Sequence, residues 1–96
     1  MIVHIVMFKF KEEDKETNLV KVKALLEELP EKIAELISIE VGINFDESER
    51  AFDLSLYSTF NSKEDLSTYA THEEHLKVVE FIKTVVEASK VVDYIL

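Results

Sequence analysis

The sequence predicts an α+β domain whose elements run strand, helix, strand, strand, helix, strand. Two kinds of pattern predict this order. Apolar residues alternate or dominate in short segments bounded by polar turns, as in strands; these are residues 2–10, 38–45, 52–60 and 91–96. Apolar residues recur at spacings of three and four, as on the buried side of a helix, in residues 19–29 and 72–88.

Composition narrows the class of protein. A chain of 96 residues that is 47% hydrophobic suits one domain, residues 1–96. Its net charge of −9 disfavours nucleic acid and anionic membrane as partners, because phosphate binding needs clustered cations. The absence of cysteine excludes disulfides and a thiolate nucleophile, and the apolar start is too short for a signal peptide. We therefore expect a cytoplasmic protein without a cofactor.

The first strand, residues 2–10, is apolar on both faces. Alternation places one set of side chains on one face: Ile2, His4, Val6, Phe8 and Phe10. The other face carries Val3, Ile5, Met7 and Lys9. A strand of this kind needs cover on both sides.

The first helix has a continuous apolar stripe and a proline stop. The stripe consists of Leu19, Val22, Leu25, Leu26 and Leu29. Pro30 ends this helix and can open a short second one over residues 31–36.

The second and third strands each have one apolar side. In the second strand these residues are Ile39, Val41, Ile43 and Phe45, and in the third they are Phe52, Leu54, Leu56, Ser58 and Phe60. Gly42, the only glycine, lies within the second strand, where a bulge, a bend or a close approach is the usual reason.

Two helical segments precede the last strand. Ser62 can cap a short helix that runs to about Tyr69, with Leu66, Tyr69 and Ala70 facing inward. Thr71 and Glu74 have the spacing of a capping box, which predicts a long helix from His72 to near Ala88. His75 would head its apolar stripe, which continues in Leu76, Val79, Ile82 and Val86.

The order of elements is that of ferredoxin-like βαββαβ folds, in which a four-stranded antiparallel sheet has its helices on one face. The other face would expose Val3, Ile5 and Met7 of the first strand. A sheet that is apolar on both sides but covered on one predicts a second copy packed against it. We therefore predict a homodimer that associates through this sheet face.

Three segments resemble the stress-responsive A/B barrel domain (Dabb) family. They are residues 2–10 (IVHIVMFKF), 69–75 (YATHEEH) and 91–94 (VVDY). The resemblance implies a dimeric α/β barrel, and it includes a branch similar to plant olivetolic acid cyclase, which cyclises a linear polyketide. For that branch it implies His4 as the strand histidine, Tyr69 as the cavity tyrosine and His75 as the catalytic base. One departure is Glu73, where family members often have proline.

Imidazole and phenol groups suit proton transfer next to a carbonyl. A base removes the proton, and a hydroxyl or second imidazole stabilises the enolate oxygen. We assign His75 as the base and His4 and Tyr69 as groups that orient the substrate or stabilise the oxyanion. His72 and Phe8 are assigned to substrate binding, in a pocket suited to a small apolar ligand.

Other interpretations of these residues remain open. His75 and His4 can be hydrogen-bonded core residues, His72 a helix-entry residue, and Tyr69 a packing aromatic. His72 and His75 with His4 or Glu74 would suffice for a zinc site, although no His-Glu-x-x-His motif is present. Two functions therefore remain open. The protein is either a small-molecule enzyme or binder, or a non-catalytic stress-responsive protein whose role is oligomerisation.

Overall fold

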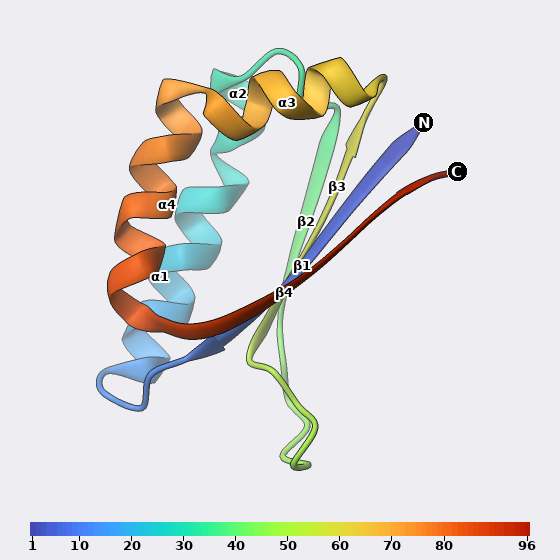
Figure 1. Cartoon of the computed structure of the whole chain (residues 1–96). Helices are drawn as coiled ribbons and strands as arrows, with labels where there is room; N and C mark the ends of the chain where they lie inside the picture. The colour runs from blue at the N-terminus through green and yellow to red at the C-terminus, as the bar shows by residue number, and fades with distance from the viewer.

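Four strands form one antiparallel sheet in the order β2-β3-β1-β4, and the helices cover one of its faces (Figure 1). The computed structural model describes all 96 residues. Its elements are β1 Ile2–Phe10, α1 Lys15–Glu27, α2 Leu29–Lys32, β2 Ser38–Ile43, β3 Leu54–Phe60, α3 Lys63–Thr71, α4 Glu73–Val85 and β4 Val86–Ile95. The predicted ferredoxin-like fold is confirmed. None of the helices has the length and apolar character of a membrane crossing.

The main core lies between the sheet and the helices. Its most deeply buried large side chains are Phe10, Leu26, Leu29, Ile33, Phe60 and Tyr69. Leu19, Val22 and Leu26 of the predicted stripe are buried and Leu25 is half-buried, but α1 ends at Glu27, so the buried Leu29 is the first residue of α2. Pro30 does not end the first helix, which stops at Glu27, but it does lie in the first turn of a second one. This helix, α2, spans Leu29–Lys32 and ends before the predicted residue 36 because Ile33 already has extended backbone angles.

The pairing of β1 positions the polar residues of the sheet. His4 lies opposite Ser58 on β3 and opposite Asp93 on β4, both in antiparallel register. Residues paired in this way point to the same face. The side chains of His4, Ser58 and Asp93 therefore all lie on the face that the helices cover.

The predicted capping box at α4 is wrong. Thr71 is the last residue of α3, and its hydroxyl donates to the Ser67 carbonyl at 3.2 Å, as threonines within helices often do. His72 is the N-cap of α4 instead, because its backbone is extended and its Nδ1 accepts the Glu74 amide N–H at 3.0 Å. The helix therefore begins at Glu73.

Helix α4 also differs from the prediction in its buried side and its end. Its buried residues are Val78, Ile82 and Val85, which follow His75 at helical spacing, whereas Leu76 is 50% exposed. The helix ends at Val85, before the predicted Ala88, because the chain then pairs with β1 from Val86 onward.

Three smaller expectations about side-chain placement are wrong. Ala70 is exposed, not inward-facing. Phe45 is 98% exposed because β2 ends at Ile43 and a hairpin loop follows. Gly42 pairs with Ser55 in an unbroken register, and a Cβ there would meet only the Ser55 hydroxyl at 3.9 Å, so the strand has neither a bulge nor a close approach.

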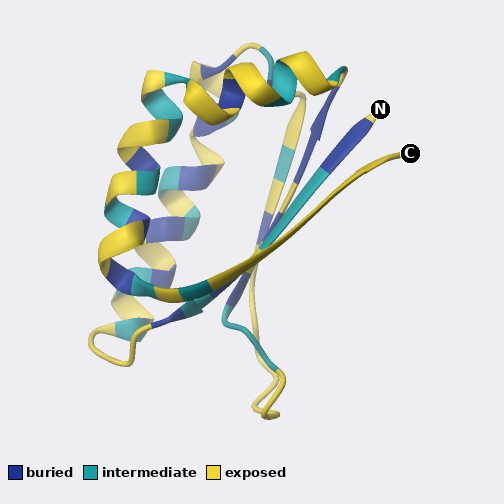
Figure 2. Ribbon diagram, in the orientation of Figure 1, coloured by how far each residue is buried: buried dark blue, intermediate teal, exposed yellow.

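The face of the sheet away from the helices is apolar and largely uncovered. Ile5 on β1 lies between Tyr57 on β3 and Val92 on β4, and Val92 is 55% exposed. Met7 is exposed as predicted, but Val3 is fully buried because Thr59 and Tyr94 flank it on the neighbouring strands. Figure 2 shows β4 exposed along most of its length.

Candidate functional site

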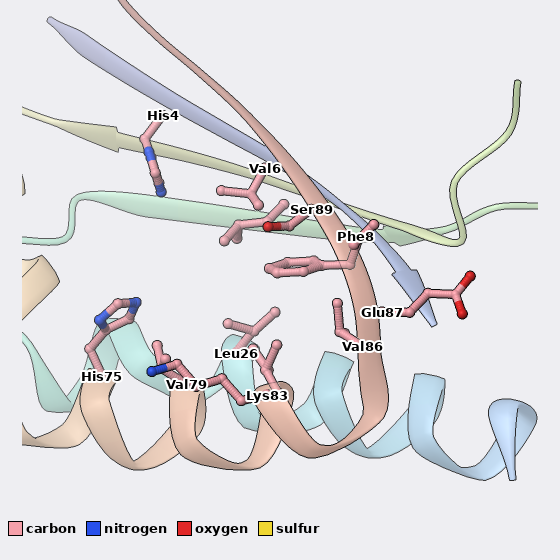
Figure 3. A pocket seen from close by; sticks show the side chains of 13 residues that line it. His4, Val6, Phe8, Leu26, His75, Val79, Lys83, Val86, Glu87 and Ser89 are labelled. Carbon is pink, nitrogen blue, oxygen red and sulfur yellow. The ribbon is translucent and has the colours of Figure 1, made fainter. Parts of the chain in front are cut away.

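A cavity of about 360 Å³ lies between the sheet and helices α1 and α4 (Figure 3). Most of its wall is apolar, formed by Val6, Phe8, Leu26, Leu56, Val79, Ile82, Val86 and Ala88. The polar lining residues are His4, His75, Lys83, Glu87 and Ser89, of which the last three are exposed. A mostly apolar cavity of this size with a few polar groups is typical of small-molecule sites.

Two histidines face each other at one end of the cavity. His4 points down from β1 and His75 points up from α4 (Figure 3). Nδ1 of His4 donates to the Asp93 carboxylate on the neighbouring strand. Because a carboxylate only accepts, this bond places the ring proton on Nδ1 and leaves Nε2 of neutral His4 as an acceptor.

His75 is held in the same way by the backbone. Its Nδ1 donates to the Ala70 carbonyl at 2.9 Å, which leaves Nε2 free to accept a proton. Burial lowers the pKa of His75, and the neighbouring rings of His4 and His72 lower it further, while the Ala70 bond opposes this change. His75 is therefore a neutral imidazole at pH 7, as a general base must be.

Tyr69 lies next to His75 in the core, outside the cavity wall. Its ring centroid is 4.3 Å from that of His75, 5.0 Å from Phe60 and 6.5 Å from His4. The side chain is 1% exposed, and its hydroxyl has no hydrogen-bond partner in the protein. Burial raises the pKa of Tyr69 to about 12, so the phenol is protonated at neutral pH.

The structure brings three of the predicted site residues together and separates one. His4, Tyr69 and His75 form one aromatic cluster, and Phe8 lines the cavity beyond it. His72 does not line the cavity, because its ring caps α4. The alternative zinc site is not formed, since His, Asp and Glu side chains nowhere gather in a group suited to a metal ion.

Comparison with known proteins identifies the family. Residues 2–96 match the sequence profile described as the Stress responsive A/B Barrel Domain. The chain belongs to this family. Among curated relatives, a stress-response A/B barrel domain-containing protein of Arabidopsis thaliana is 33% identical over 81 residues. That match covers 83% of this chain but only 30% of the Arabidopsis protein, so the A/B barrel domain is a fraction of that protein's length.

Solved structures share the A/B barrel domain fold along the whole chain. One is a dimeric protein of unknown function and ferredoxin-like fold from Bacteroides fragilis, with 33% identity and a TM-score of 0.90. It covers 99% of this chain and 95% of its own. Another is a hydroxynitrile lyase from Passiflora edulis, with 19% identity, a TM-score of 0.88, and coverage of 99% and 92%. The second likeness is one of fold alone.

The site of this A/B barrel domain also contains residues that were not assigned to it from the sequence: Asp93, Lys83, Glu87 and Ser89. Asp93 carries a hydrogen bond to His4, and Lys83 lines the cavity. Asp93 lies in one of the segments that resemble the family, but its role depends on the register of β4 on β1. Lys83 follows His75 by eight residues, which places both on the same side of a helix. This spacing could have predicted that Lys83 lies near the site.

Proposed function

We propose that this A/B barrel domain is a homodimeric small-molecule enzyme that uses His75 as a general base. The observation that supports this proposal is the His75 ring, whose Nδ1 is bonded to the Ala70 carbonyl and whose Nε2 is free at the end of an apolar cavity opposite His4. A buried imidazole with one nitrogen anchored and one free is suited to proton abstraction.

The reaction class is proton removal from carbon beside a carbonyl, the first step of an aldol-type cyclisation. Nε2 of His75 takes the proton, and the C–H electron pair moves into the carbonyl, so that negative charge develops on its oxygen. Nε2 of His4 accepts a hydrogen bond from the substrate and orients it, while the Tyr69 ring packs against His75 behind the cavity wall and orients the base. Phe8 and its apolar neighbours hold the rest of the substrate, while His72 acts only at the start of α4.

Dimerisation follows from the uncovered sheet face. Ile5, Tyr57 and Val92 form an apolar row across three strands on the side without helices. The relative from Bacteroides fragilis, which is described as dimeric, shares 33% of its sequence with this chain. A second copy packed on this face would bury the row.

The alternative is a non-catalytic stress-responsive protein whose role is oligomerisation. The bond from His75 to the Ala70 carbonyl is also what a structural histidine would make. The cavity favours the enzyme, because a purely structural His75 would be expected in a filled core.

The test is exchange of carbon-bound hydrogen in D2O, with phenylacetone as the probe and NMR as the readout. We expect the wild-type protein to accelerate exchange beside the carbonyl, and His75→Gln to lose about a hundredfold of that rate. His72→Asn is the matched control, since asparagine keeps a helix cap while removing an imidazole outside the cavity. Equal rates for wild type and His75→Gln, or a wild-type rate equal to that of buffer, would contradict the proposal.

A further inference from the structure

We propose that Lys83 makes the cavity selective for small carboxylic acids, with its ammonium binding the carboxylate and the apolar wall binding the rest of the molecule. This inference rests on the proposed function, because it names the class of substrate that would reach His75. The positions of His75, Val79 and Lys83 on α4 support this inference.

Lys83 lies on the same side of α4 as His75 and Val79, and all three line the cavity. Figure 3 shows its side chain running back along the helix, so that the ammonium lies beside Val79, toward His75. Long helical side chains lean toward the N-terminus in this way. The charge therefore lies nearer the imidazole than the backbone of Lys83 does.

The Lys83 ammonium has no carboxylate partner within the protein. The ion pairs of α4 involve Lys77, which lies 3.9 Å from Glu73 and 3.6 Å from Glu74, and none involves Lys83. Glu87 is the only carboxylate in the cavity wall, and Figure 3 shows its carboxyl group pointing away from Lys83. A bound acid would supply the missing counter-charge.

The negative charge of the rest of the chain also favours acid binding at Lys83 over acid binding elsewhere. Twenty acidic residues against eleven basic ones repel an anion from most of the surface. A lysine at the rim of an apolar cavity makes the local electrostatic potential positive. The expected ligand is an apolar acid whose carboxylate stays at the exposed rim, because a fully buried charge would lose its hydration.

The ligand's orientation follows from these contacts. With the carboxylate at Lys83, the apolar part fits against Val6, Phe8 and Leu56. A neutral analogue of the same shape would keep the apolar contacts and lose only the charge interaction. That difference isolates the contribution of Lys83.

The experiment compares 4-phenylbutanoate with 4-phenylbutanamide in NMR titrations at about pH 8 and low salt, where His75 is neutral and screening is weak. We expect the acid to bind about fivefold to tenfold more tightly than the amide. Lys83→Met should abolish this preference by weakening acid binding to the level of the amide. Lys77→Met, on the same helix but outside the cavity, should retain it.

The outcomes distinguish the two proposals. Equal binding of acid and amide to wild type, with His75 resonances shifted by both, would overturn the role of Lys83 and leave the cavity intact. A preference that survives Lys83→Met, or that Lys77→Met removes, would assign it to the general surface field and also overturn the inference. If neither compound shifts His75, the binding cavity itself is contradicted.

Discussion

The Asp93 carboxylate accepts a hydrogen bond from Nδ1 of His4 across the β1–β4 pair. The two residues are 89 positions apart in the chain, at its opposite ends. This bond selects one tautomer of His4 and directs Nε2 away from β4, toward His75 (Figure 3). Asp93 is therefore a positioning residue for the cavity.

Asp93→Ala should leave the His4 ring without a single preferred tautomer. Without the carboxylate, neither ring nitrogen has a fixed partner from β4, so both neutral forms become populated. The ¹⁵N shifts of the His4 ring report this directly. Because Asp93 is 46% exposed, the free energy of unfolding should fall by less than about 1 kcal/mol. Unchanged ¹⁵N shifts would show that other contacts hold the ring.

Tyr69→Phe should stabilise the protein. The buried hydroxyl has no partner, so its removal relieves a desolvation cost and should raise the free energy of unfolding by about 1 kcal/mol. Urea unfolding of the two proteins measures this difference. Destabilisation by a similar amount would instead reveal a hydrogen bond of the hydroxyl within the protein.

Tyr69 should also make stability depend on alkaline pH. Its pKa is about 12 in the folded protein and about 10 when unfolded, so its contribution is complete below pH 10. That contribution is lost as the pH rises from about 10 to 12, up to about 2 to 3 kcal/mol. Across this pH range, the free energy of unfolding should fall less for Tyr69→Phe than for the wild-type protein. Identical pH curves would contradict the raised pKa.

The order of elements could be predicted because hydrophobic spacing is a local property of the chain. The stripe of α1 and the buried side of β3 follow directly from it. The end of α4 could not, since the β-branched Val85 and Val86 fit a helix or a strand, and pairing of Val86 with Phe10 decides between them. Either Thr71 or His72 can cap a helix, and only the backbone angles distinguish them.

The sequence predicted which residues belong to the candidate site better than it predicted the contacts between them. Alternation and helical spacing allow His4 and His75 to lie on facing elements, but both faces of the first strand are apolar, so the sequence alone does not decide which face meets the helices. The bond to Asp93 requires the register of β4, and the position of Tyr69 behind His75 depends on how α3 crosses the sheet end (Figure 1). These are tertiary relationships that no local pattern contains.

His75 should titrate below 6.5, because burial and the neighbouring His4 and His72 rings disfavour its charged form. The folded protein then binds this proton less readily than the unfolded chain, so stability falls as the pH drops below about 6.5. NMR titration of the ring gives the midpoint, and acid unfolding gives the stability. In His75→Gln the fall should be smaller, since glutamine can donate to Ala70 without titrating. A midpoint at or above 6.5 would contradict the expected burial.

Val92→Lys should separate the dimer. Val92 lies beside Ile5 and Tyr57 on the uncovered face, and a two-fold axis through this face would bring like charges from both copies into an apolar interface. Such a change costs several kcal/mol, so the dissociation constant should rise by about a hundredfold or more. Sedimentation velocity distinguishes the 11.1 kDa chain from a particle of twice that mass.

Val20→Lys is the matched control, since Val20 is 65% exposed on α1, on the opposite side of the molecule from the uncovered face. It introduces the same charge at a similarly exposed valine, and its sedimentation should equal that of wild type. If Val92→Lys also sediments as wild type, the uncovered face is not the contact. Because this face lies across the sheet from the cavity, a monomeric Val92→Lys that still binds 4-phenylbutanoate would show that each subunit contains a complete site.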